Sequence, residues 1–257
     1  MADNAARAGR IVWYELMTSD VEAAKTFYTS VVGWTVKQSE NSPMPYHEIQ
    51  RPGGGWVGGI VATPPQVTAP PHWGMYLLVD NVEEAVSRVE AAGGKSLSPL
   101  IDIPKVGRFR TVTDPQGAAF TVFQAAEPMT GPDHVPEVGD VSWHELLTTD
   151  AEAAMQFYTT QFNWQKTETM DMGEMGTYHM FGRDFPLGGM MNKAAAMADV
   201  PPHWGFYFRV ANLTEAIDRV NAGGAKVLNG PMEVPGGDTV VNCLDPLGAY
   251  FSLHQKK

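Results

Sequence analysis

Two glutamates, Glu15 and Glu145, occupy matching places in two copies of one short motif, which reads Trp-Tyr-Glu-Leu in the first copy and Trp-His-Glu-Leu in the second. A carboxylate in an apolar segment is costly to bury unless it is paired or hydrogen-bonded. His72 and His203 also recur at matching places, so each could orient the nearby glutamate as a general base for proton abstraction. In the alternative interpretation, the glutamates anchor backbone amides and the histidines lie in Pro-rich entrance loops.

The whole chain is an internal repeat. Twelve of the twenty-two positions from Trp13 to Trp34 recur at an offset of 130, and Pro-His-Trp-Gly and Asp-Pro-x-Gly recur at an offset of 131. Solenoid repeats are only 20–50 residues long, so this period duplicates a complete domain. We expect a first domain at 8–125, a Pro-rich linker at 126–139 and a second domain at 140–255.

The composition excludes several classes of protein. Of 257 residues, 44% are hydrophobic and 18% are charged, as in a globular chain, and the formal charge of −11 disfavours nucleic acid as a partner. No apolar run approaches the roughly 20 residues of a membrane span, and the first ten residues contain no apolar segment of the length that a secretory signal needs. We expect a cytoplasmic protein whose partner is a small molecule, with a homodimer possible. The single cysteine, Cys243, forms no internal disulfide.

The order of predicted elements repeats twice within each half. A strand from Ile11 to Thr18 precedes a helix capped by Asp20, and three short strands follow that helix. A second strand begins near Trp73, and Asn81 caps the next helix before further strands. The spacing therefore predicts a βαβββ module twice in each half.

Several of these features resemble the vicinal oxygen chelate superfamily of glyoxalases, bleomycin-resistance proteins and extradiol dioxygenases. The resemblance lies in the Phe27-Tyr28 pair with the Gly33-Trp34 helix end, the Ala91-Ala-Gly-Gly94 helix stop, and the Asp114-Pro-x-Gly117 turn. It implies an α+β fold of two tandem glyoxalase/bleomycin-resistance-like domains, each built of paired βαβββ modules that form a half-open barrel. The tandem form looks most like bacterial proteins labelled glyoxalase-like.

The resemblance also implies a ligand cavity inside each half-barrel, and strand alternation then predicts the side chains that line it. Trp13 and Trp143 would form stacking platforms for a flat ligand, although core filling is the alternative. The predicted ligand-binding residues are Trp13, Trp143, Tyr76, Tyr207, Tyr46, Tyr178, Thr121, Ser252 and Arg209.

Metal-dependent members of the superfamily place their ligands at positions that read Trp13, Gly74 and Thr121 in the first half. The same positions read Trp143, Gly205 and Ser252 in the second half. None of these is a good metal ligand, so we expect no metal at the family positions and no cofactor. Each indole would occupy the space that the paired glycine leaves empty. An alternative divalent-metal trio, confined to the second half, is Glu145, His203 and His254.

Two classes of function fit these residues. One is an enzyme that acts on a small organic molecule, either lyase- or isomerase-like or oxidoreductase-like, with the glutamate and histidine in acid–base roles. The other is a non-catalytic protein of the bleomycin-resistance type that binds and sequesters a drug or metabolite. The missing metal ligands favour binding, whereas the duplicated Glu and His favour catalysis.

Overall fold

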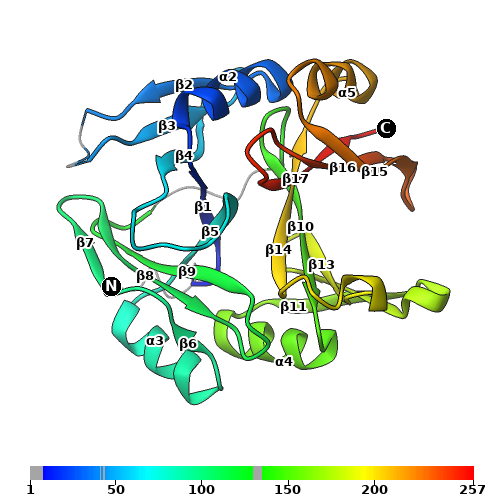
Figure 1. Cartoon of the computed structure of the whole chain (residues 1–257). Coiled ribbons are helices and arrows are strands. Elements are labelled where there is room, and N and C mark those ends of the chain that lie inside the picture. Colours follow the sequence, from blue (N-terminus) through cyan, green and yellow to red (C-terminus); the bar gives the residue numbers. More distant parts are fainter. Residues whose placement is uncertain (1–7, 41, 43, 130–134) are drawn as a thin grey trace. The chain divides into compact units, whose positions relative to one another are not determined.

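The computed structural model describes residues 8–40, 42, 44–129 and 135–257 (Figure 1). Residues 130–134 of the predicted linker thus lie outside the described part. The helices are α2 (Val21–Val32), α3 (Val82–Ala91), α4 (Ala151–Phe162) and α5 (Leu213–Ala222), with short 3₁₀ turns η1 (Gly173–Met175) and η2 (Ala195–Met197).

The described strands confirm the predicted βαβββ order in all four modules, with one additional short strand, β7, in the second. Those of the first half are β1 (Ile11–Thr18), β2 (Thr35–Gln38), β3 (His47–Gln50), β4 (Trp56–Ala62), β5 (His72–Leu78), β6 (Lys95–Ser96), β7 (Ile101–Ile103), β8 (Gly107–Thr113) and β9 (Ala119–Ala125). Those of the second half are β10 (Val141–Thr148), β11 (Gln165–Asp171), β12 (Thr177–Gly182), β13 (Pro186–Asn192), β14 (His203–Arg209), β15 (Lys226–Glu233), β16 (Thr239–Leu244) and β17 (Tyr250–Gln255).

Local sequence sets the bounds of α2. The Asp20 side chain caps its first turn by accepting a hydrogen bond from the Ala23 amide at 3.0 Å. The helix ends at Gly33, whose φ of 85° is the left-handed conformation that glycine adopts without strain. In the second copy Asn163 takes this place with φ of 56°, and asparagine is among the few other residues that tolerate it. The cap predicted at Asp20 is therefore confirmed.

The chain forms two compact units, each of which combines segments from both copies of the repeat. Unit 1 comprises Met1–Val12, Met75–His134 and His144–Trp204, and unit 2 comprises Trp13–Gly74, Val135–Trp143 and Gly205–Lys257. Unit 2 holds most of the strand run β2-β3-β4-β1 and of the run β14-β17-β16-β15. Unit 1 holds most of β11-β12-β13-β10 and of β5-β9-β8-β6, with β7 paired to β8.

A buried hydrogen-bond chain joins the two copies inside unit 2. Tyr28 of α2 donates from its hydroxyl to the Asp245 carboxylate at 3.0 Å and accepts from the Trp73 indole at 2.9 Å. Asp245 also accepts backbone hydrogen bonds within its own turn from Leu247 and Ala249. Because buried polar groups are costly without partners, this chain specifies how the two modules pack.

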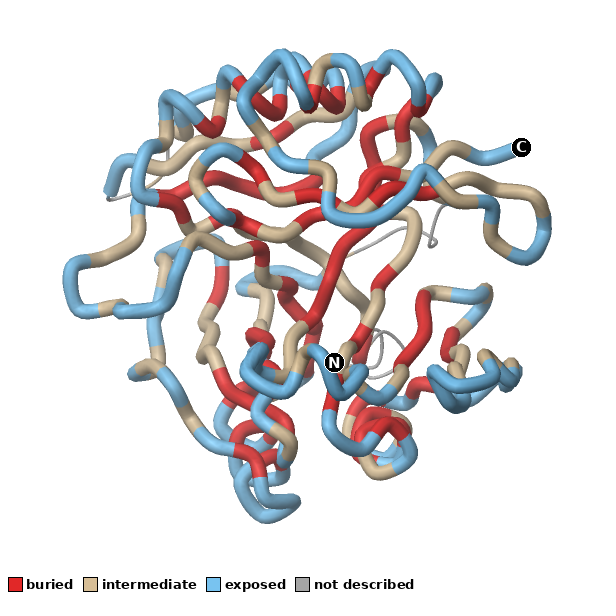
Figure 2. Tube along the Cα trace, turned by 45° about the vertical axis from the view of Figure 1, so that its right-hand side comes forward, coloured by how far each residue is buried: buried red, intermediate tan, exposed pale blue. Residues whose placement is uncertain are grey.

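Unit 1 contains the same arrangement with the copies exchanged. Tyr158 of α4 donates to Asp114 at 3.2 Å and accepts from Trp204 at 3.0 Å. Burial raises the pKa of Asp114 above its ordinary value, although the hydrogen bonds from its turn oppose this shift. In Figure 2 the buried stretches of the chain lie mainly in the strands and on one side of the helices. Tyr28 and Tyr158 are among the fully buried residues of those helices.

Candidate functional site

In the first half, Glu15 is held by a tyrosine. The indole nitrogen of Trp13 donates to the Tyr46 hydroxyl at 2.7 Å, and Tyr46 in turn hydrogen-bonds the Glu15 carboxylate. Burial, followed by the negative charge of Glu15, raises the pKa of Tyr46 far above its ordinary value. The hydroxyl therefore stays protonated and acts as the donor, so the chain runs from indole to phenol to carboxylate.

A glycine makes this contact possible. Glu15 of β1 is in register with Gly59 of β4, which is in turn in register with Glu48 of β3, two residues after Tyr46. A Cβ built at Gly59 would lie 2.1 Å from the Tyr46 hydroxyl oxygen and 2.3 Å from its ring carbon Cζ. The phenol ring thus lies directly over the glycine to reach the glutamate. We call this packing of a tyrosine ring over a glycine the tyrosine seat.

The second half repeats the arrangement. Tyr178 donates to Glu145 Oε1 at 3.1 Å, and Glu145 of β10 is in register with Gly189 of β13. A Cβ at Gly189 would lie 2.0 Å from a ring carbon of Tyr178. The same glycine-seated tyrosine therefore holds a carboxylate in each half.

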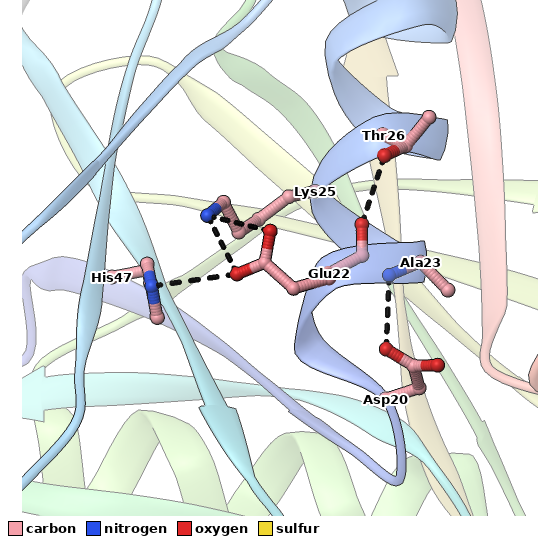
Figure 3. Close-up of polar contacts among 6 residues, drawn as sticks. All are labelled: Asp20, Glu22, Ala23, Lys25, Thr26 and His47. Atoms are coloured by element: carbon pink, nitrogen blue, oxygen red, sulfur yellow. Dashed lines mark hydrogen bonds and ion pairs between the residues drawn. The ribbon is translucent and has the colours of Figure 1, made fainter.

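The residue after each of these tyrosines points to the opposite face of its strand. His47 Nε2 lies 4.0 Å from the carboxylate of Glu22 on α2, and Glu22 also binds Lys25 at 2.8 Å (Figure 3). In the second half, His179 lies 3.4 Å from Glu152 of α4. Burial lowers the pKa of both histidines. The alternation thus directs each histidine toward a helix and each tyrosine away from it.

His72 and His203 have other hydrogen-bond partners than the ones we expected. His72 Nδ1 lies 2.8 Å from the Pro70 carbonyl oxygen, and His203 Nδ1 lies 2.9 Å from the Pro201 carbonyl oxygen. Each imidazole is therefore oriented by its own Pro-rich loop. The glutamates are hydrogen-bonded by tyrosines, and their pairing with His72 and His203 stays a prediction.

The donor chemistry does not fit the superfamily's metal. Its ligand positions carry indole, glycine and hydroxyl groups, and no group of three or more His, Cys, Asp or Glu side chains in the described part of the chain could hold a metal ion. The alternative trio is corrected as well. Glu145 binds Tyr178, His203 binds its loop carbonyl, and His254 lies 2.7 Å from Ser142 and 2.9 Å from Asp238.

The expectation that Trp13 fills the space beside Gly74 is wrong. A Cβ at Gly74 would meet only the main-chain oxygen of Glu15, at 4.0 Å, because the indole is directed toward Tyr46 instead. Open space therefore remains beside the Glu15 backbone. Trp143 lies on β10 two residues before Glu145, and it is half-buried like Trp13.

The remaining predicted ligand-binding residues, apart from Arg209, lie in two groups of neighbouring side chains. We call each group a wall. In unit 2, Tyr207 and Ser252 lie next to Asn242, whose amide nitrogen is 3.3 Å from the first hydroxyl and 2.8 Å from the second. In unit 1, Tyr76 packs against Phe109, with ring centroids 5.4 Å apart, and Thr121 bonds Thr111 at 3.1 Å. Arg209 donates to the Pro136 carbonyl oxygen, which fixes its guanidinium against the main chain.

Sequence reasoning missed Gly59, Gly189 and Asn242. The glycines carried a usable signal, since a Gly-Gly pair recurs in both copies at the same distance after the glutamate. Asn242 carried a weaker one, because the first copy has Thr111 at that place. The role of Asn242 can be recognised only from the side chains that surround it in the folded chain.

Comparison with known proteins identifies the class. The model of the Glyoxalase/Bleomycin resistance protein/Dioxygenase superfamily matches residues 10–122 and 138–253, and the chain belongs to this superfamily. No helix among the described residues has the length and apolarity to cross a membrane.

Two relatives extend over nearly the whole chain. The chain is 33% identical to "Putative glyoxylase CFP32" of Mycobacterium tuberculosis, covering 96% of this chain and 95% of that protein. It is 29% identical to "Anthracycline biosynthesis protein DnrV" of Streptomyces peucetius, covering 95% and 92%. Among solved structures, the Mn(II)-bound glyoxalase from Novosphingobium aromaticivorans shares the fold with a TM-score of 0.64 at 17% identity, covering 97% of this chain and 83% of that one.

Proposed function

We propose that the chain binds a flat, ketone-bearing small organic molecule and removes a proton from it, with Glu15 and Glu145 as general bases. The observation that carries this proposal is the tyrosine-held carboxylate, which occurs in both halves. A fixed carboxylate beside a carbon acid can accept the proton of a C–H bond, while the electron pair of that bond passes to the ketone oxygen as an enolate; such positioned bases contribute roughly 10²–10⁴-fold. The reaction needs no metal at the family positions, in line with their indole, glycine and hydroxyl side chains.

The ligand class follows from the aromatic side chains around the acids and from one relative. Trp13 lies beside Tyr46 and Glu15, which gives a flat ring a surface on which to stack. The relative named as an anthracycline biosynthesis protein supports a polycyclic aromatic ligand. An anthracycline with a ketone side chain is therefore a suitable first probe, because its C–H bonds beside the ketone exchange with solvent when a base removes the proton.

The second candidate function is binding without chemistry. It is favoured by the absence of ligating side chains at all six family metal positions. In this case the tyrosine–glutamate contacts would only shape the wall of a sequestering site. Both candidates predict binding of the anthracycline, but only the first predicts exchange.

One experiment separates the two candidates. The anthracycline is titrated into the protein by quenching of tryptophan fluorescence, and its deuterium uptake from D2O is followed by mass spectrometry. We expect wild-type protein to accelerate uptake, and Glu15→Gln with Glu145→Gln to lower the accelerated rate by about 100-fold while the dissociation constant changes less than threefold. Uptake at the solvent rate despite binding would refute catalysis and leave sequestration, whereas absence of both would refute both.

A matched control changes Trp13, whose indole is the first donor of the hydrogen-bond chain. Trp13→Phe keeps an aromatic ring but removes the donor to Tyr46, so we expect quenching to diminish and exchange to fall less than in the glutamate variant. Metal analysis of the purified protein accompanies each assay. Activity that depends on a bound metal would contradict the proposed mechanism.

A further inference from the structure

The two groups of side chains that we call walls differ in chemistry between the copies. The second module of each copy presents the same ladder positions, because Tyr76 pairs with Thr121 as Tyr207 pairs with Ser252. Opposite Ser252 stands Asn242, where the first copy has Thr111 opposite Thr121. Matching ladder positions therefore carry different side chains, and the differences can be compared position by position.

The first copy's wall is aromatic and internally satisfied. Tyr76 packs against Phe109 and Phe123, with ring centroids 5.4 Å and 6.3 Å away. The two threonine hydroxyls bond each other at 3.1 Å, so each has a partner within the wall. Such a wall offers ring faces rather than hydrogen bonds to a ligand.

The second copy's wall is polar. Asn242 Nδ2 lies 2.8 Å from the Ser252 hydroxyl, 3.0 Å from the Tyr250 hydroxyl and 3.3 Å from the Tyr207 hydroxyl. Tyr250 replaces Ala119 of the first copy, and Val240 replaces Phe109. Aromatic contacts have thus been exchanged for a group of hydrogen-bonding side chains.

The Asn242 side chain has unused hydrogen-bonding capacity at its oxygen. Asn242 Oδ1 has no hydrogen-bond partner among the described residues, and it is not one of their fully buried unpaired atoms. The outer edge of the amide therefore reaches accessible space. Rotating the amide by 180° would leave its NH2 group at that edge, which is equally able to bind oxygen.

We propose that the second half recognises a hydroxyl or carbonyl oxygen of its ligand through Asn242 and Tyr250, whereas the corresponding wall of the first half takes an apolar ring. This inference rests on the proposed function, because it assigns oxygen-substituted members of the proposed ligand class to the second half and unsubstituted members to the first. A chain with two such walls distinguishes oxygen-substituted rings from unsubstituted ones.

The inference is tested in the full chain by substitutions that give each wall the side chains found at the matching positions of the other half. Asn242→Thr with Tyr250→Ala gives the second wall the side chains of Thr111 and Ala119, and Phe109→Val gives the first wall the side chain of Val240. The probes are a ring-hydroxylated anthracycline and 2-methylnaphthalene, a flat ring without oxygen, titrated by calorimetry. Thermal unfolding checks that both variants fold, as we expect for residues that the chain already accepts at these positions.

We expect each variant to lose affinity for one probe and to keep its affinity for the other. The Asn242/Tyr250 variant should bind the anthracycline at least tenfold more weakly and 2-methylnaphthalene unchanged, and Phe109→Val should do the reverse. The Asn242 side-chain amide signals in nuclear magnetic resonance spectra should shift with the anthracycline only. Wild-type anthracycline affinity in a folded Asn242/Tyr250 variant overturns the inference and leaves the proposed function intact. Failure of wild-type protein to bind either probe overturns both.

Discussion

At the scale of single residues, the partner of each glutamate determines how the site responds to pH. A histidine beside Glu15 would change charge near neutrality. Tyr46 does not, because burial and the adjacent carboxylate raise its pKa far above the physiological range. The Tyr46 hydroxyl therefore remains a hydrogen-bond donor to Glu15 at neutral and alkaline pH, which suits a base that must keep a fixed geometry.

His144 is the residue whose titration should affect stability most visibly. It is fully buried, its Nδ1 contacts the Leu187 carbonyl oxygen at 2.7 Å, and burial lowers its pKa from 6.5 to about 4. The unfolded chain therefore binds a proton between pH 6.5 and 4 that the folded chain does not. Stability should fall as pH falls through this window, by about 3 kcal/mol in total.

Urea unfolding at several pH values measures this effect. His144→Tyr introduces the residue that the first copy has at Tyr14, and it should flatten the dependence of unfolding free energy on pH between 6.5 and 4. The informative quantity is the slope, since the substitution can also change stability at neutral pH. A slope identical to that of the wild type would show that other groups account for acid sensitivity.

At the scale of elements, sequence patterns predicted the order and type of the strands and helices well. Period-two alternation and the capping Asp20 are local signals, which predict strands and helix ends without knowledge of the tertiary structure. The glutamate's partner could not be predicted in the same way. Tyr46 reaches Glu15 only because β4 lies between β3 and β1 and carries Gly59 at the position over which the tyrosine ring passes. This contact depends on strand order, which the amino-acid pattern does not contain.

Gly59→Ala tests the tyrosine seat. The added methyl group would occupy space 2.1 Å from the Tyr46 hydroxyl, so the ring must move and lose its contacts to Trp13 and Glu15. We expect a loss of stability of about 1–3 kcal/mol, a shifted Trp13 indole N–H signal and reduced exchange activity. Gly53→Ala is a suitable comparison for crowding, since a Cβ there meets nothing within 4 Å, although its positive φ adds backbone strain. An unchanged indole signal in Gly59→Ala would contradict the seat.

The contact between helix and turn inside each unit gives a second element-scale prediction. Tyr158→Phe removes the hydroxyl that bonds Asp114 and Trp204 and leaves buried polar atoms without that partner. We expect a destabilisation of about 1–3 kcal/mol in urea unfolding, with Tyr28→Phe similar because it has the same two kinds of partner. Wild-type stability in both variants would show that these contacts contribute little.

At the scale of the whole molecule, the motifs that reveal the superfamily also connect the two copies of the repeat. The Phe-Tyr pair of one copy supplies Tyr28, and the Asp-Pro-x-Gly turn of the other supplies its partner, Asp245. Each compact unit therefore draws on both halves of the sequence. The repeat predicted two equivalent halves, but it could not show that modules of opposite halves pack together, because both pairings satisfy the same pattern.

This exchange of modules predicts that one copy cannot fold alone as a monomer. In unit 1, Phe120 packs against Phe157, Tyr158 and Phe162 of the other copy, and a fragment of residues 1–129 would expose that apolar surface. We expect this fragment to dimerise or aggregate in size-exclusion chromatography. Co-expression with residues 135–257 should restore a stable 1:1 complex, with tyrosine and tryptophan circular dichroism like that of the intact chain. A monomeric fragment with cooperative unfolding would show that each copy has a sufficient core of its own.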